Sequence, residues 1–135
     1  MKFSTIFFLA LATLTTSAQL AVTVSPPKVV GQKAIVTLEM KNDFSENIKS
    51  ARASCFLLNE QGEMVGQSAK WVINANLNKA GLAAGGTNEF NFVITASQPF
   101  ATTNLTAKIN FSRVILTSGQ VVDMGKNVQI KNSQQ

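Results

Sequence analysis

The chain has 135 residues, about the length of one domain, with 12 Lys and Arg residues against 7 Asp and Glu and no His. Without His, one chain alone cannot form a Ser-His-Asp triad, a Cys-His nucleophile pair or a His-ligated metal site. The single Cys excludes an internal disulfide framework and a Cys-based zinc site. The content of 45% hydrophobic and 14% charged residues excludes a disordered chain.

Residues 1–18 have the pattern of a secretory signal peptide. A positively charged start is followed by the apolar run 3–14, and small side chains occupy the two positions that a signal peptidase reads, Thr16 and Ala18. The apolar run has about 12 residues, whereas a membrane-spanning helix needs about 20. We therefore predict cleavage after Ala18, in preference to Ala21.

Cleavage at that point leaves residues 19–135 as the mature chain, which we expect to form a single domain. Since Lys2 leaves with the leader, 12 − 1 = 11 basic groups remain against 7 acidic ones. No second apolar stretch approaches membrane length, so we expect no membrane span in the mature chain. The expected location is the periplasm or the medium.

Apolar and polar residues alternate with a period of two along most of the mature chain, as they do in half-buried β-strands. Val, Ile, Thr and Phe dominate these runs, and no segment has apolar residues at helical spacing over three turns. In chain order, the pattern predicts strands at residues 20–24, 34–41, 48–59, 64–73, 88–95, 105–116 and 120–130.

Polar and glycine-containing segments separate these strands. Residues 42–47 form a polar turn, 60–62 a tight hairpin connection and 74–86 a long loop. A phase slip at 113–116 indicates a β-bulge, and residues 131–135 are expected to fray. About seven short strands with such connections predict an all-β fold, an Ig-like or fibronectin-like antiparallel β-sandwich, and a small barrel is the alternative.

Three short motifs lie between residues 34 and 95: an Asn-containing turn, a strand that ends at a Gly turn, and a Gly loop before an aromatic strand. They are Lys41-Asn42-Asp43, then Phe56-Leu57-Leu58-Asn59-Glu60 with Gly62, then Leu82, Gly85 and Phe90. Together they resemble the FxLYD-type Ig-like domains of bacterial extracytoplasmic proteins. Phe56 and Leu58 match the family signature, whereas Asn59 and Glu60 replace its Tyr and Asp. The resemblance implies an extracytoplasmic β-sandwich and transfers neither a catalytic activity nor a cofactor site.

Two aromatic residues are candidates for ligand contact, since an exposed aromatic ring on a sandwich can stack on a sugar or a peptide. Trp71 shares a predicted strand face with Val65, Ala69 and Ile73, so core packing is the preferred interpretation. Phe100 lies in a loop without an apolar neighbour at period two and is the better exposed candidate. Loop aromatics often fold back as plugs, so packing is preferred for Phe100 as well.

The only thiol, Cys55, lies between Ala53 and Leu57 on one predicted strand face. This position predicts a small buried hydrophobic side chain. An exposed thiol or a disulfide between two chains is the alternative.

The acidic residues give no pattern typical of a catalytic or metal site. Asp43 and Glu46 share one turn, but the spacing of a calcium-binding loop is missing, and a solvated turn is the preferred interpretation. Glu60 and Glu63 flank a hairpin in which nothing forms a water-excluding pocket. We therefore predict no catalytic residues, no metal, no cofactor and no enzymatic activity.

Four basic residues near the C-terminus, Lys108, Arg113, Lys126 and Lys131, are candidates for a basic stripe. Nucleic-acid binding needs clustered charge with stacking aromatic residues, and the chain has no Tyr. A solubilising face is the preferred interpretation, and we expect no nucleic-acid partner.

These patterns favour a non-catalytic secreted or periplasmic protein that acts as a structural or protein-binding module of the cell envelope. The expected contact with an envelope or extracellular protein is through a sheet edge or through the loop 74–86. The alternative is a small-ligand or carbohydrate-binding module that uses Trp71 or Phe100 as its platform. An enzyme that works with Asp or Glu alone is a third, less favoured, interpretation.

Overall fold

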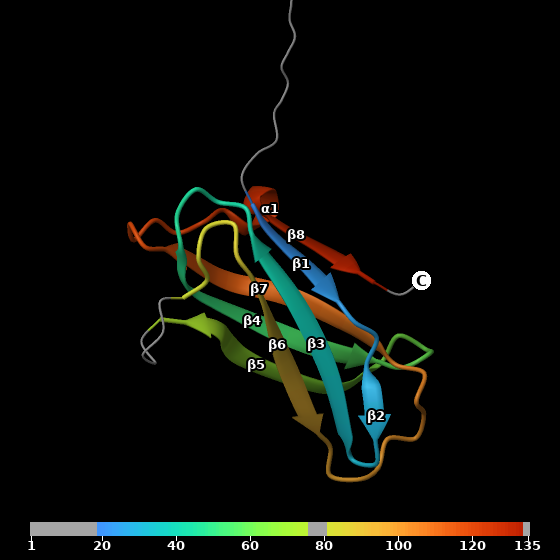
Figure 1. The fold of residues 1–135 in the computed structure, drawn as a ribbon. Helices are drawn as coiled ribbons and strands as arrows, with labels where there is room; N and C mark the ends of the chain where they lie inside the picture. The colour runs from blue at the N-terminus through green and yellow to red at the C-terminus, as the bar shows by residue number, and fades with distance from the viewer. Residues whose placement is uncertain (1–18, 76–80, 134–135) are drawn as a thin grey trace, which may run out of the picture.

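The computed structural model describes residues 19–75 and 81–133, and nearly all regular secondary structure in that part of the chain is β-structure (Figure 1). Two sheets pack face to face, so the predicted all-β sandwich is confirmed. The predicted signal peptide, residues 1–18, lies outside the described residues. Within them, no helix is both long and apolar enough to cross a membrane.

The described residues form eight strands and one helical turn. They are β1 (Leu20–Val24), β2 (Lys28–Val30), β3 (Lys33–Asn42), β4 (Ile48–Leu58), β5 (Met64–Asn74), β6 (Thr87–Thr95), β7 (Thr106–Leu116), α1 (Met124–Asn127) and β8 (Val128–Asn132). The five-stranded sheet is built around β3, which pairs with β6 on one side and with β1 and β2 on the other, while β8 pairs with β1. In the three-stranded sheet, β4 lies between β5 and β7.

The core lies between the sheets because one face of each central strand is apolar. The predicted inward faces of β3 and β4 are fully buried, at 0% exposure for Ala34, Val36, Leu38 and Met40 and for Ala51, Ala53, Cys55 and Leu57. Burial of such apolar surface, at about 25 cal/mol per Å², is the main favourable term in folding. The opposite faces of the two sheets remain in contact with water.

The C-terminal segment differs from the predicted single strand over residues 120–130. Val121 forms only an isolated bridge to β7, and Asp123 then caps α1 by accepting a hydrogen bond of 3.0 Å from the backbone N of Gly125. After this turn β8 joins β1 in a parallel pair. The prediction of a purely antiparallel sandwich is therefore wrong at this edge. The prediction that residues 131–135 fray is wrong for residues 131–132, which belong to β8, and residues 134–135 lie outside the described residues. Alternation identifies the buried face of a strand but not the edge that the strand joins.

The predicted polar turn at residues 42–47 is not simply solvated, because the side chain of Asn42 is fully buried. Its Nδ2 donates to the backbone carbonyl oxygens of Glu46 at 3.0 Å and Leu82 at 2.9 Å. Its Oδ1 accepts a hydrogen bond of 2.8 Å from the backbone N of Phe44. Asn42 therefore joins the turn after β3 to the segment that precedes β6.

The segment before β6 is also bridged to the start of β4, and the residue before this bridge must be a glycine. Gly81 has a φ of +83°, and a Cβ at this position would meet the carbonyl oxygen of Ile48. The next residue, Leu82, is bridged to Ile48 by two backbone hydrogen bonds of 2.9 Å. A methyl group at residue 81 would therefore strain the backbone and also clash with the Ile48 carbonyl oxygen, which accepts one of these hydrogen bonds.

We expect Gly81→Ala to lower the free energy of unfolding by about 2 kcal/mol or more, as measured by urea denaturation. Gly85→Ala is the matched control, because Gly85 also has a positive φ, +76°, but has open space around the Cβ position. The control is expected to lose about 1 kcal/mol from the backbone conformation alone. Equal losses in the two variants would show that the close approach to Ile48 has no energetic consequence.

Candidate functional site

Trp71 is exposed, so the preferred interpretation that it packs in the core is wrong. Its side chain is 40% exposed, whereas Val72 and Ile73 are 6% and 4% exposed. The reason is a β-bulge in β5: Arg52 lies opposite Trp71, but Ala51 lies opposite Ile73, which leaves Val72 as the extra residue. The bulge turns two consecutive apolar residues inward and leaves Trp71 on the outer face of the three-stranded sheet.

Phe100 is half-buried and packs against the core, as expected for a loop aromatic that folds back. Its backbone N donates to the carbonyl oxygen of Gly31 at 3.1 Å, which fixes it beside the turn between β2 and β3. The structure therefore does not bring Phe100 and Trp71 together. Of the two predicted candidates, Trp71 offers the larger free surface.

Arg52 lies in the middle of the outer face of the three-stranded sheet, between Trp71 on β5 and Arg113 on β7. Its guanidinium carbon is 5.8 Å from the centre of the Trp71 ring, a distance typical of a cation–π contact. A second bulge, at Ser112 of β7, flanks the same arginine, and the Ser112 hydroxyl donates to the Arg52 carbonyl oxygen at 3.4 Å. Bulges are frequent beside functional sites because they reorient side chains. Here they frame the row Trp71–Arg52–Arg113.

A shallow hollow of about 310 Å³ lies next to this row on the same sheet. Two residues further along β4, Ser54 lies opposite Ala69, and the next outward residue, Phe56, lies opposite Gln67. Their side chains line the hollow together with Ser68. We call this surface the Trp71 face and define it by Arg52, Ser54, Phe56, Gln67, Ala69, Trp71, Lys108, Asn110 and Arg113.

The sequence analysis missed Arg52 and Phe56 as site residues. The alternation along β4 could have identified both, because they occupy the positions between the buried residues Ala51, Ala53 and Cys55 or next to them and therefore point outward. The partners of Arg52 lie on other strands, however, and only the pairing of the strands reveals them.

Charge is distributed unevenly between the two sheets. The three strands of the three-stranded sheet contain five basic residues, Lys49, Arg52, Lys70, Lys108 and Arg113, and no Asp or Glu. All 7 acidic residues of the chain lie on other segments. The predicted basic stripe is divided, because Lys126 lies on α1 and Lys131 on β8 of the other sheet. The excess of basic over acidic residues is therefore larger on the strands of the three-stranded sheet.

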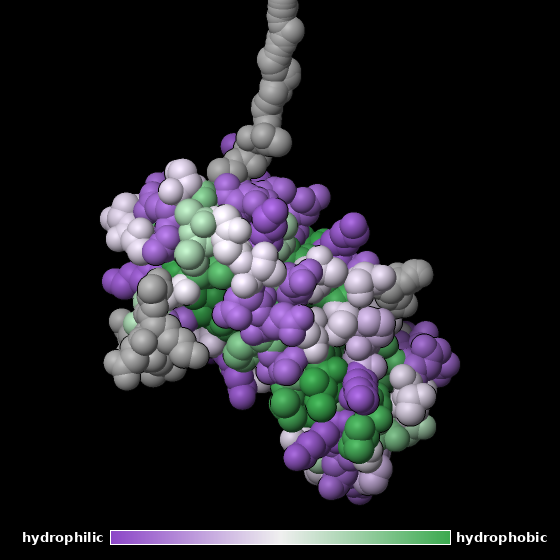
Figure 2. Space-filling view, viewed as in Figure 1, coloured by the Kyte–Doolittle hydropathy of each residue, from purple (hydrophilic) through white to green (hydrophobic). Residues whose placement is uncertain are grey.

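The outer face of the five-stranded sheet carries a different exposed surface. In Figure 2, which views this face, apolar surface gathers at the end where β2 and β6 lie. Val30 and Val93 are 61% and 42% exposed there, and Ile35 lies directly opposite Val93. This patch contains no aromatic ring and is flanked by Lys28 and Lys33. It gives exposed apolar residues that can serve as controls for Trp71.

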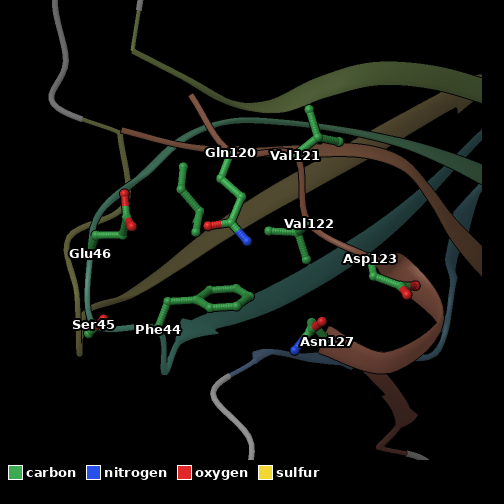
Figure 3. A pocket seen from close by; sticks show the side chains of 9 residues that line it. Phe44, Ser45, Glu46, Gln120, Val121, Val122, Asp123 and Asn127 are labelled. Carbon is green, nitrogen blue, oxygen red and sulfur yellow. The ribbon is translucent and has the colours of Figure 1, made fainter. Parts of the chain in front are cut away.

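The acidic residues of the predicted turn have structural partners. Figure 3 shows a depression of about 300 Å³ that is lined by Phe44, Glu46 and Asp123, among others. The Glu46 carboxylate accepts hydrogen bonds from the backbone N of Ser118 at 2.9 Å and the hydroxyl of Thr117 at 3.2 Å. The Ser118 backbone N–H is the main cause that lowers the pKa of Glu46. Glu46 therefore holds the turn after β7 in place.

The remaining acidic candidates are also engaged at the surface. Asp43 forms an ion pair with Lys41 at 3.7 Å. Glu60 accepts a hydrogen bond of 2.9 Å from the Asn104 side chain, and Glu63 accepts one of 3.0 Å from Asn59. Among residues 19–75 and 81–133, no three His, Cys, Asp or Glu residues form a group that could hold a metal ion.

Cys55 is fully buried, as predicted, and burial raises the pKa of its thiol to about 11. Because the thiolate is the reactive form, we expect no reaction with an aromatic disulfide reagent at about pH 8 in the folded protein. One thiol per chain should react after unfolding in urea, which is the control. Rapid reaction of the folded protein would contradict the buried position of Cys55.

No protein family, curated protein or solved structure matches this chain. The resemblance to the FxLYD-type domains therefore stays a prediction.

Proposed function

We propose that the protein is a non-catalytic, exported β-sandwich that acts as a binding module, with the Trp71 face as its binding surface. The signal-peptide pattern of residues 1–18 supports export to the periplasm or the medium. The single observation that carries the proposed binding function is the 40% exposure of Trp71 in contact with Arg52.

The 40% exposure of Trp71 leaves a large apolar and polarisable surface that another molecule can cover. Trp and Arg are among the residues that contribute most to the binding energy of interfaces. On this face both extend from paired strands, and the cation–π contact orients the guanidinium over the ring. Such preorganisation lowers the entropy lost on binding.

The ligand that this arrangement favours is a small molecule or a carbohydrate that stacks on Trp71. The hollow that begins at the next outward pair of residues, Ser54 and Ala69, supplies the Ser54 hydroxyl and the Gln67 amide as hydrogen-bonding groups. Apolar surface with a few convergent polar groups is the usual composition of a ligand site. We also propose that the sandwich is Ig-like, which the two-sheet architecture supports.

A second candidate function, the binding of an envelope protein through a sheet edge, is favoured by β7. Because β8 joins the five-stranded sheet, the described residues place no strand beside residues 106–112 of β7 on the side away from β4. Edge strands present backbone N–H and C=O groups to which an extended segment of a partner can add. The predicted alternative contact, the loop 74–86, lies partly outside the described residues.

Replacing the indole tests the proposed surface. Trp71 is the only Trp of the chain, so its intrinsic fluorescence reports directly on this face during a titration with glycans. We expect Trp71→Ala to weaken glycan binding at least about tenfold, measured by affinity electrophoresis, since loss of an aromatic anchor costs about 2 kcal/mol or more. The Trp71-dependent capture of partners from the native envelope is measured in parallel.

The matched control is Val30→Ala, which removes an exposed apolar side chain from the other sheet. It should leave binding within about twofold of the original protein, since residues outside an interface contribute little to affinity. Binding that survives Trp71→Ala but is lost in Val30→Ala would place the binding surface on the five-stranded sheet and contradict the proposal.

A further inference from the structure

The pair Arg52 and Arg113 gives the Trp71 face a chemical preference. Building on the proposed binding function, we infer that the face binds an acidic carbohydrate, a polysaccharide whose sugar rings bear carboxylate or sulfate groups. The two arginines would hold the acidic group, while Trp71 stacks on the apolar side of the sugar ring.

Arg52 and Arg113 lie opposite each other on neighbouring strands. They are direct cross-strand partners on β4 and β7, and like charges directly opposite each other destabilise a sheet. Proteins usually relieve such repulsion with an acidic neighbour, but β4, β5 and β7 contain no Asp or Glu. Glu89 of β6 lines a depression together with Trp71, but among residues 19–75 and 81–133 the ion pair joins Lys41 and Asp43, and Glu89 forms none with either arginine. An anion bound between Arg52 and Arg113 would remove the repulsion.

The shape of a guanidinium group favours carboxylate and sulfate anions. A guanidinium group presents its donors in a planar fork that matches the two oxygens of a carboxylate, or two of a sulfate. Arg113 is exposed and Arg52 half-buried, and Arg52 is already oriented by its contact with Trp71. The row therefore offers two guanidinium groups and an aromatic ring on three neighbouring strands.

The hollow along β4 favours a sugar over an acidic peptide. The hollow lined by Ser54 and Gln67 begins two residues along β4 from Arg52, a separation of about 7 Å, which is comparable to the width of one sugar ring. A sugar has hydroxyl groups at its rim for these side chains and an apolar C–H face for Trp71. A single acidic side chain of a peptide would meet the arginines but could not also cover the ring and fill the hollow, whereas one acidic sugar unit has groups for all three.

The experiment compares each acidic polymer with its neutral counterpart. Polygalacturonate is titrated against its fully methyl-esterified form, and dextran sulfate against dextran, with Trp71 fluorescence and affinity electrophoresis as readouts. Polyglutamate is the peptide comparison. The variants are Arg113→Gln and, as a matched change of charge on the other sheet, Lys28→Gln, and circular dichroism checks that each is folded.

We expect at least one acidic polysaccharide to bind about tenfold more tightly than its neutral form, because hydrogen bonds to charged groups contribute about 1.5–3 kcal/mol. Arg113→Gln should lower this affinity about fivefold or more, and Lys28→Gln should change it less than about twofold. Equal affinity for the acidic and neutral forms would overturn the inference. If Trp71→Ala then weakened the binding of both forms, the proposed binding function of the Trp71 face would still be supported.

Three other outcomes also overturn the inference. Equally tight binding of polyglutamate would identify an acidic polypeptide as the ligand. Equal losses in Arg113→Gln and Lys28→Gln would show general charge attraction rather than a site. Failure of every polymer to bind would exclude an acidic glycan, and Trp71-dependent capture of an envelope protein would then still support the binding module.

Discussion

Replacing Asn42 by Ala is expected to lower the free energy of unfolding by about 3–4 kcal/mol, because three backbone groups lose their partner at once. The carbonyl oxygens of Glu46 and Leu82 and the backbone N of Phe44 all bond to this one side chain, which is fully buried. A buried polar group left without a partner costs about 1–3 kcal/mol. The loss should appear in urea denaturation as a lower midpoint with an unchanged slope.

Asn47→Ala is the matched control for this prediction. Asn47 lies in the same turn, but its side chain accepts a single exposed hydrogen bond, from the backbone N of Ala84 at 3.0 Å. Water can replace that bond, so the expected loss is below about 1 kcal/mol. If Asn42→Ala loses no more stability than Asn47→Ala, Asn42 does not organise the connection between β3 and β6.

The strands were predictable because their signal is local. Alternation placed a strand at residues 34–41, and β3 spans Lys33–Asn42; the strand predicted at 48–59 is β4, Ile48–Leu58. The predicted phase slip near residue 113 is also confirmed, since the pairing of β4 with β7 shifts register next to Arg113. Each of these features is set by neighbours within a few residues in the chain.

The exposure of Trp71 was not predictable from the same pattern. Val65, Ala69 and Trp71 do share a face, as their spacing indicates, but all three are exposed. The inward positions of β5 include Gly66, where a Cβ would lie only 3.0 Å from the Ile94 side chain of the opposite sheet. Close packing between the sheets thus selects a small residue for the inner face, and hydrophobicity alone predicts the wrong side.

The pairing of Arg52 with Arg113 was hidden for a different reason. The two residues are far apart in sequence, and the basic residues look scattered along the chain. Only the alignment of β4 with β7 brings them together and shows that the whole three-stranded sheet lacks acidic side chains. The choice of neighbouring strand depends on non-local packing, which a single sequence does not reveal.

Phe92→Ala should lower the free energy of unfolding by about 3–5 kcal/mol, the usual cost of removing a buried Phe ring. Phe92 is fully buried on β6, and its ring meets that of Phe90 edge-on, with centroids 5.3 Å apart. The adjacent residue gives the control: Val93 lies on the same strand but is 42% exposed, so Val93→Ala should cost less than about 1 kcal/mol in urea denaturation. Both variants replace a strand-favouring residue by Ala, so the difference between them measures burial rather than strand propensity. Similar losses in the two variants would mean that β6 does not direct Phe92 into the space between the two sheets. The division into a buried core and two exposed outer faces would then no longer hold, and the Trp71 face depends on that division.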